Sequence, residues 1–175
     1  LAYDSNEKVN LSTLYDVASL TKVLTTTPII IKLIQQNKLN LSIPISQFYN
    51  NLDSSKINIT IYDLLTHSAG FKPYIEYYRY SNIKNRDSMI SDILAQPLSY
   101  LTGTDVVYSD LGLILLLDII EKISSQSLDV LADKWFYSPL GMKSTVFNPS
   151  IHNNIAPTEN DNYFRNKLLV GEVHD

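Results

Sequence analysis

A serine and a lysine lie three residues apart at the start of the first long apolar stretch of the chain. They are Ser19 and Lys22, which lie within residues 16–22, and the apolar stretch itself is residues 23–34. Residues at positions i and i+3 share one face of a helix, so the hydroxyl and the amine can meet. A serine hydroxyl becomes a useful nucleophile only when a nearby base accepts its proton. The spacing predicts a nucleophile with its base, although the same spacing also arises by chance in sequences without catalytic function.

The amine can accept a proton at neutral pH only if its pKa falls from the ordinary value near ~10.4. The apolar Leu20, Val23 and Leu24 flank Lys22. We expect these side chains to desolvate the amine and to lower its pKa. A helix that begins at Ser19 would also direct backbone N–H groups and a partial positive charge at a developing oxyanion.

Length and composition narrow the classes of function. A chain of 175 residues with 45% hydrophobic residues predicts one domain, residues 1–175, with a core of its own. A net charge of -4 with no basic stripe argues against a nucleic-acid partner. The absence of cysteine excludes disulfides and thiolate sites, and His67, His152 and His174 lack metal-ligand spacing, so we expect no metal and no cofactor. The apolar stretches 23–34 and 111–120 are too short to span a bilayer.

Periodicity and capping residues predict the elements that must hold these groups. A first helix is entered over residues 15–22 and ends at Asn37, and Pro28 kinks it or marks a local break. Further helices are expected over residues 45–52, 61–66 with Thr60 as N-cap, 87–95, 111–123 and 128–135. Short strands are expected over residues 1–3 and 9–11, as the remnant of a hairpin, and over residues 144–147.

Two segments lack clear periodicity. Residues 71–85 carry four tyrosines and are expected to form a long loop, which either binds a ligand or simply covers the surface. Residues 148–161 are rich in Asn and Pro and are expected to be irregular.

A tyrosine precedes the most apolar helix. A short β-branched run, residues 106–107, is expected to deliver Tyr108 to a turn just before residues 111–123. A strand-to-turn junction can hold such a side chain rigidly at a pocket wall. The alternative is that Asp110 is the helix N-cap and that Tyr108 is a core aromatic residue with a satisfied hydroxyl.

Four separated segments together resemble one family. Residues 18–22 (Ala-Ser-Leu-Thr-Lys) match a Ser-x-x-Lys motif, residues 64–71 (Leu-Leu-Thr-His-Ser-Ala-Gly-Phe) match an LLTHTSGL segment, residues 108–110 (Tyr-Ser-Asp) match a Tyr-x-Asn motif, and residues 139–143 (Pro-Leu-Gly-Met-Lys) match a PLGM turn. In this order and separation they resemble the serine β-lactamase and penicillin-binding-protein superfamily. The resemblance is to its class C-like branch of esterases, D-amino peptidases and β-lactamases, and it covers nearly the whole chain.

The resemblance implies a role for each motif residue. Ser19 would be the acylated nucleophile, and Lys22 its proton-accepting neighbour. Tyr108 would be a second acid–base group, which passes the proton to the leaving group and later activates water. A phenolate beside the Lys22 ammonium would suit that task, and the sequence leaves open how the two groups share the proton. His67 would belong to a scaffold turn.

Two departures from the family pattern bear on activity. Asp110, a substrate-binding position, stands where β-lactamases usually carry an asparagine that orients the substrate, which favours ester or peptide hydrolysis over β-lactam hydrolysis. Aspartate is common there among esterase-like members. Nothing after Val146 resembles the third motif, Lys-Thr-Gly or His-x-Gly, which supplies one oxyanion-hole N–H. Loss of one such donor typically costs ~10² to 10³ in rate.

The implied fold is α/β (α+β), a β-lactamase/transpeptidase-like helical lobe against an antiparallel sheet, here without the C-terminal strands and final helix. We expect another segment, the C-terminal remainder of the fold, to complete it. The implied function is that of a serine hydrolase that forms an acyl-enzyme with an ester, amide or β-lactam, and the substrate is a small molecule or of peptidoglycan type. The resemblance also implies an extracytoplasmic location. The alternative is a non-catalytic module, or an inactive fragment, that binds peptidoglycan-type ligands.

Overall fold

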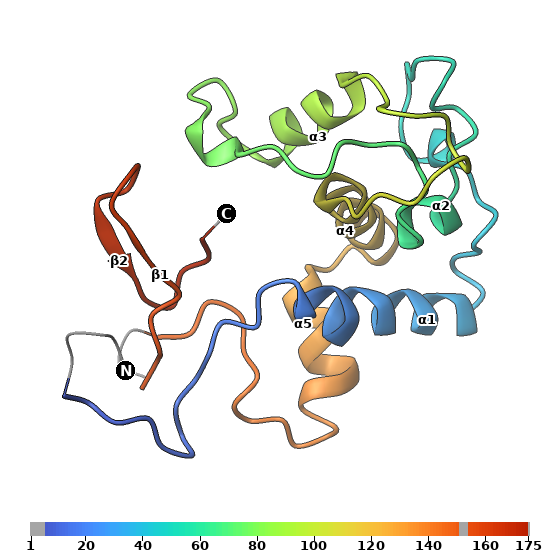
Figure 1. The fold of residues 1–175 in the computed structure, drawn as a ribbon. Helices are drawn as coiled ribbons and strands as arrows, with labels where there is room; N and C mark the ends of the chain where they lie inside the picture. Colours follow the sequence, from blue (N-terminus) through green and yellow to red (C-terminus); the bar gives the residue numbers. More distant parts are fainter. Residues whose placement is uncertain (1–5, 151–153, 175) are drawn as a thin grey trace. The chain divides into compact units, whose positions relative to one another are not determined.

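The computed structural model describes residues 6–150 and 154–174, which form two compact units. The helical unit comprises Lys22–Leu128. The terminal unit comprises the described residues up to Thr21 and from Asp129 onward. Figure 1 shows helices throughout the first unit and the small sheet of the second. The strand expected over residues 1–3 lies outside the described residues.

The long helix α4 (Asp110–Ser124) is the core of the helical unit. Its apolar face is fully buried, and Leu115, Leu116 and Ile119 have no exposed surface. The shorter helices α2 (Ile61–Leu65) and α3 (Arg86–Ala95) pack against it (Figure 1). The predicted helices over 61–66, 87–95 and 111–123 are therefore confirmed, with boundaries within a residue or so of those expected.

The first helical segment changes its hydrogen-bond pattern where a break was predicted. A π-helix, η1 (Lys22–Thr26), passes into α1 (Thr27–Gln35), and Pro28 lies in the first turn of α1. Proline has no N–H to donate, so the helix lacks one backbone bond there. The hydroxyl of the preceding Thr27 donates to the carbonyl of Lys22 at 2.9 Å. The segment ends as predicted, with Asn37 in the left-handed conformation at φ 56°.

Side-chain caps define the short helices. The Thr60 hydroxyl accepts from the Asp63 N–H at the start of α2, and the Asp63 carboxylate accepts from the Thr60 N–H at 2.8 Å. Asn85 and Ser88 form the same reciprocal arrangement at the start of α3. Such caps satisfy the donors that a helix leaves unpaired at its N-terminus. Residues 45–52 contain only the 3-10 turn η2 (Ile45–Gln47), so the helix expected there was predicted too long.

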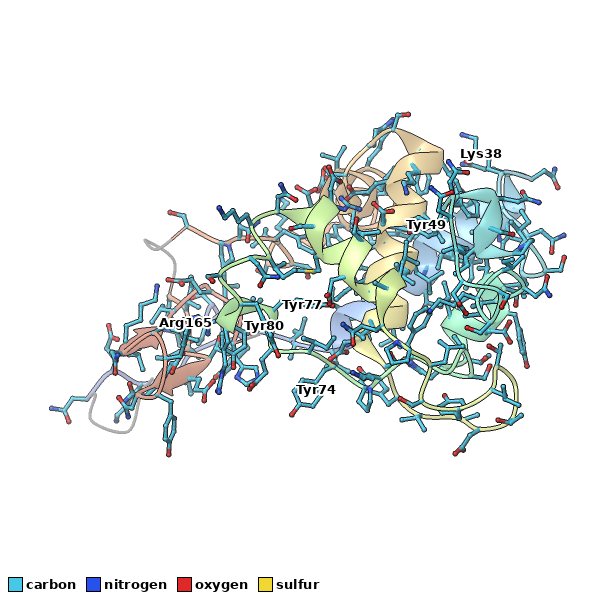
Figure 2. The ribbon with its side chains drawn as sticks, turned by 90° about the horizontal axis from the view of Figure 1, so that it is seen from above. Lys38, Tyr49, Tyr74, Tyr77, Tyr80 and Arg165 are labelled. Atoms are coloured by element: carbon cyan, nitrogen blue, oxygen red, sulfur yellow. The ribbon has the colours of Figure 1, made fainter. Side chains whose placement is uncertain are left out.

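The tyrosine-rich segment 71–85 is a loop with one 3-10 turn, η3 (Tyr77–Arg79). Tyr77 is buried and its hydroxyl donates to Asp92 at 2.8 Å, and burial is the main reason why its pKa is raised. Tyr74 and Tyr80 are mostly exposed, and Tyr74 points away from the ribbon (Figure 2). The loop therefore keeps one tyrosine as an anchor and presents others to solvent.

The terminal unit contains a two-stranded antiparallel sheet. Strand β1 (Glu159–Asp161) pairs with β2 (Lys167–Leu169), with Asn160 opposite Leu168. The Asp161 carboxylate accepts the N–H groups of Tyr163, Phe164 and Arg165 at 3.1, 2.8 and 3.1 Å, which closes the turn between the strands. Residues 159–161 are thus regular where an irregular segment was expected.

The other predicted strands are wrong. Residues 9–11 and 144–147 form turns and irregular backbone, and no ladder joins them to another part of the described chain. Near residues 9–11, a single parallel bridge joins Leu14 and Ile155.

The helix expected over 128–135 is divided into α5 (Leu128–Ala132) and a π-helix, η4 (Asp133–Tyr137).

Two loops of the helical unit are joined by hydrogen bonds that hold the segment before α4. The carbonyl of Gly70 accepts from the Ser99 N–H at 2.7 Å, and the carbonyl of Ser68 accepts from the Gly103 N–H at 2.9 Å. The carbonyl of Ala69 accepts from the Thr102 hydroxyl at 3.0 Å. The interlocked loops, residues 67–70 and 99–107, therefore form one rigid support.

A comparison of two glycines tests this support. Gly70 has φ +94°, and a Cβ there would lie 2.4 Å from the carbonyl oxygen of Tyr100, whereas a Cβ at Gly103, with φ +79°, would meet nothing within 4 Å. We expect Gly70→Ala to lower the free energy of unfolding by ~3 kcal/mol or more, and Gly103→Ala by ~1 kcal/mol, because only the first adds a backbone clash to the cost of positive φ. Chemical denaturation of both variants measures the difference, and equal losses would show that the loops do not interlock at Gly70.

Candidate active site

Ser19 stands immediately before the helical backbone, which begins at Leu20. Ser19 lies within a tight turn: the Leu20 N–H donates to the Val17 carbonyl at 2.9 Å, and the Asp16 carboxylate accepts from the Ala18 N–H at 2.8 Å. Ala18 adopts φ 44°, a left-handed conformation that costs a non-glycine residue roughly 1–2 kcal/mol. Ser19 itself is exposed. The predicted nucleophile therefore follows a strained residue at the start of a helix, where N–H groups lack intrahelical partners.

Three of the predicted site residues come together in the helical unit, and we call them the amine cluster: Lys22, Tyr108 and Asp110. The Lys22 Nζ lies 2.7 Å from the Asp110 Oδ1. It also lies 5.0 Å from the centroid of the Tyr108 ring. The Lys22 side chain is only 20% exposed, whereas half of Tyr108 is open to solvent. The cluster thus joins a half-buried ammonium to a carboxylate and to an accessible phenol.

The amine cluster overturns the prediction that the pKa of Lys22 is lowered. Burial does lower this pKa, but hydrogen bonds and charge interactions with Asp110 and Tyr108 outweigh burial and raise it above 10.5. The apolar neighbours expected to enclose the amine, Leu20, Val23 and Leu24, are themselves largely exposed. Lys22 is therefore an ammonium at neutral pH.

The backbone after Tyr108 is held from two sides. The Ser109 N–H donates to the His67 Nδ1 at 3.1 Å, and the Ser109 hydroxyl donates to the Lys72 carbonyl at 2.7 Å. The Asp110 N–H donates to the Pro73 carbonyl at 2.7 Å. The start of the tyrosine-rich loop is thereby tied to the two residues that follow Tyr108.

Two expectations for this segment are corrected. Residues 106–107 have no regular secondary structure, so the predicted strand is absent and the interlocked loops position Tyr108 instead. The N-cap of α4 is Ser109, whose hydroxyl accepts from the Gly112 N–H at 3.3 Å, and Asp110 is the first helical residue. Because Asp110 does not cap the helix and Tyr108 is half exposed, the alternative of a cap and a core aromatic residue is wrong.

His67 contributes more than the scaffold role expected of it. Its backbone and ring do accept hydrogen bonds from neighbouring segments, as expected. Its ring also lies 4.6 Å, centroid to centroid, from that of Tyr108 at an interplanar angle of 38°. The sequence signal for His67 was its place in the 64–71 motif, but no spacing reveals a ring contact between residues so far apart in the chain.

Among the described residues, no group of three or more His, Cys, Asp or Glu could hold a metal ion. His152, one of the three histidines, lies outside the described residues. No helix within 6–150 or 154–174 is long and apolar enough to cross a membrane.

A comparison with models of protein families shows the family to which this chain belongs. Residues 2–163 match the family model described as Beta-lactamase. The chain belongs to the β-lactamase family. The four motifs had indicated this superfamily, and that prediction is confirmed.

Two curated relatives of this chain are named as an amidase and a putative carboxypeptidase. It is 31% identical over 195 residues to the N-acetylmuramyl-L-alanine amidase of Bacillus subtilis (strain 168), an alignment that covers 96% of this chain and 44% of the relative. It is also 31% identical to a putative D-alanyl-D-alanine carboxypeptidase of Salmonella typhi, again over 96% of this chain and 45% of the relative. The chain thus spans less than half the length of these relatives.

A solved structure supports the fold. The octameric penicillin-binding protein homologue from Pyrococcus abyssi superposes with a TM-score of 0.71 at 26% identity, over 83% of this chain and 36% of that one. The predicted fold class, a β-lactamase/transpeptidase-like mixture of helices with an antiparallel sheet, is confirmed.

The Lys22–Asp110 pair makes a prediction about titration. Asp110→Asn removes the carboxylate that raises the pKa of Lys22, so we expect the pKa of the amine to fall below the wild-type value. An NMR titration of the Lys22 Nζ measures it.

In the wild type, the raised pKa means that Lys22 contributes stability in full below about pH 10.5, and that this stability is lost as the pH rises through the folded-state pKa.

The control for the NMR titration is Glu172→Gln, which removes a surface pair with Lys167 and should leave the pKa of Lys22 unchanged. An Asp110→Asn variant that titrates like the wild type would contradict the assignment of Asp110 as the main partner.

Proposed function

We propose that the natural protein containing this chain is a serine hydrolase that acts through an acyl-enzyme, with Ser19 as the nucleophile. The observation that carries this proposal is the amine cluster, in which a lysine and a tyrosine of two separate family motifs meet. A binding module without catalysis has no need of an ammonium held beside an accessible phenol. The motif order of the β-lactamase family supports the same assignment.

The proton is handled by Tyr108 rather than by Lys22. Because Lys22 is already an ammonium at neutral pH, it has no free pair with which to accept the Ser19 proton. It instead holds a positive charge 5.0 Å from the centroid of the Tyr108 ring. In the proposed reaction the phenolate accepts the proton as Ser19 Oγ bonds to the substrate carbonyl, and returns it to the leaving group as the old bond breaks. For deacylation, Tyr108 removes a proton from the water that attacks the acyl carbonyl, and returns it to Ser19 Oγ as the acyl–Oγ bond breaks.

The proposed substrate is an amide or ester of peptidoglycan type. The names of two relatives, an amidase and a D-alanyl-D-alanine carboxypeptidase, support this class. Asp110 supports it as well, because a carboxylate paired with Lys22 offers no amide N–H to orient a β-lactam. Since peptidoglycan lies outside the cytoplasm, we propose an extracytoplasmic location.

The third motif of the family has no counterpart in this chain, so the proposal includes a further polypeptide segment that supplies the second oxyanion-hole donor. Residues 1–175 would then be part of one β-lactamase-like domain, as the sequence predicts. The coverage of less than half of each named relative supports this. The missing donor alone corresponds to ~10² to 10³ in rate.

A substitution of Ser19 tests the nucleophile. In the natural-length protein we expect a fluorophosphonate to add one adduct to the wild type and none to Ser19→Ala, and p-nitrophenyl acetate turnover to fall at least ~10³-fold. Because Ser19 is exposed, stability should change by less than ~0.5 kcal/mol. Intact-mass spectrometry and thermal unfolding measure these effects.

The matched control is Ser81→Ala, an exposed serine of the tyrosine-rich loop, which should be labelled like the wild type. An adduct that persists on Ser19→Ala would refute the nucleophile, and a wild type that never labels would favour the non-catalytic alternative.

The substrate preference is tested at Asp110. Asp110→Asn restores an amide donor at the position where β-lactamases carry one, and a hydrogen bond of about 1.4 kcal/mol corresponds to a ~tenfold gain in β-lactam turnover. Hydrolysis of a chromogenic cephalosporin measures the gain. Asp105→Asn, an exposed neighbour outside the amine cluster, should show none, and an equal absence of gain in Asp110→Asn would contradict the substrate argument.

A further inference from the structure

His67 accepts hydrogen bonds from the backbone on both sides of Tyr108. Its carbonyl oxygen accepts from the Val107 N–H at 3.1 Å, and its Nδ1 accepts from the Ser109 N–H at 3.1 Å. Between these two bonds, the imidazole lies against the Tyr108 ring at 4.6 Å. One residue therefore fixes the residue before Tyr108, the residue after it and its ring.

The bond from Ser109 defines the state of the imidazole. A backbone N–H can only donate, so the Nδ1 must carry a lone pair, and the proton of the neutral ring lies on Nε2. An imidazolium carries a proton on both nitrogens and cannot accept from Ser109. Protonation of His67 thus breaks one of the bonds that fix Tyr108.

The backbone of His67 is held in a strained conformation by the same contacts. Its φ is 57°, a left-handed value that is uncommon outside glycine, although His is among the residues enriched there. The Tyr100 hydroxyl donates to its carbonyl at 2.9 Å and also accepts from the Val107 N–H at 3.2 Å. Strain that persists because surrounding bonds over-determine it is typical of functional sites.

The charges around His67 keep the ring neutral. Burial and the Lys22 ammonium lower the pKa of His67 below 6.5, and the Asp110 carboxylate opposes them without reversing the direction. Tyr108 and Tyr100 are the other titratable groups in contact with the residue. The neutral ring therefore predominates at pH 7, and His67 gains its proton only at lower pH.

We propose that neutral His67 is a positioning residue that holds Tyr108 against Lys22 for proton transfer, and that protonation of its ring loosens this hold. The proposal deepens the proposed function and rests on it for the catalytic consequence. It gives the site an acid limit below about pH 6.5, set by a residue that acts through Tyr108.

The hold itself is tested without catalysis, by NMR of the natural-length Ser19→Ala protein. We expect the His67 nitrogens at pH 7.5 to show the Nε2-protonated neutral tautomer, with a titration midpoint below 6.5, and the Tyr108 ring signals to shift with the same midpoint. A proton on Nδ1, or Tyr108 signals that do not follow the titration of His67, would overturn the proposal.

The catalytic consequence is tested with two variants of His67. His67→Asn keeps a side-chain acceptor and tolerates the left-handed backbone but does not titrate, whereas His67→Phe keeps an aromatic ring and loses the acceptor. For the burst of p-nitrophenolate from p-nitrophenyl acetate, we expect His67→Asn to acylate within about threefold of the wild type and to lose the acid limb. We expect His67→Phe to lower kcat ~tenfold or more with KM unchanged, because the acceptor that positions Tyr108 is gone.

The control is His174→Asn, an exposed histidine paired with Glu159, which should leave the pH profile as in the wild type. An acid limb retained by His67→Asn, or a full rate in His67→Phe, would overturn the positioning role. If the wild-type protein never acylates Ser19, the proposed function fails while the NMR experiment still decides whether His67 holds Tyr108.

Discussion

The ion pair between Lys22 and Asp110 joins the first residue of η1 to the first residue of α4, and the rest of the site depends on it. Asp110 lies in the first turn of α4, where the helix dipole favours a carboxylate. Because Tyr108 lies two residues earlier, the pair that anchors the two helix starts also brings the phenol to the ammonium. The Lys22–Asp110 ion pair therefore both supports the fold and brings the residues of the candidate site together.

The same pair decides which group handles protons. Burial alone would favour a neutral amine at Lys22, as the sequence suggested, but a carboxylate 2.7 Å away makes the ammonium the stable form. With an asparagine in place of Asp110, the amine would lose its counter-charge and an amide would face the substrate. The one departure of this chain in the tyrosine motif therefore alters both the charge state of the cluster and the group offered to a ligand.

Local chemistry was predictable from the sequence, and pairing between distant segments was not. Thr60, Pro28 and Asn37 act through their own backbone neighbours, so capping, the helix break and the helix end followed from residue type. The strand over residues 144–147 failed because a strand needs a partner, and β-propensity does not say whether one exists. The prediction of a lowered pKa for Lys22 was wrong for the same reason, since its partner Asp110 comes from another motif.

His67 shows that scaffold and chemistry are not separate assignments in this fold. A turn residue in a left-handed conformation would ordinarily be replaceable by glycine, which adopts positive φ without cost. Glycine has no side chain to accept from Ser109 or to contact Tyr108, whereas a neutral imidazole with its proton on Nε2 does both. The position therefore bears backbone strain in order to carry a side chain, which is reasonable only if the exact placement of Tyr108 matters.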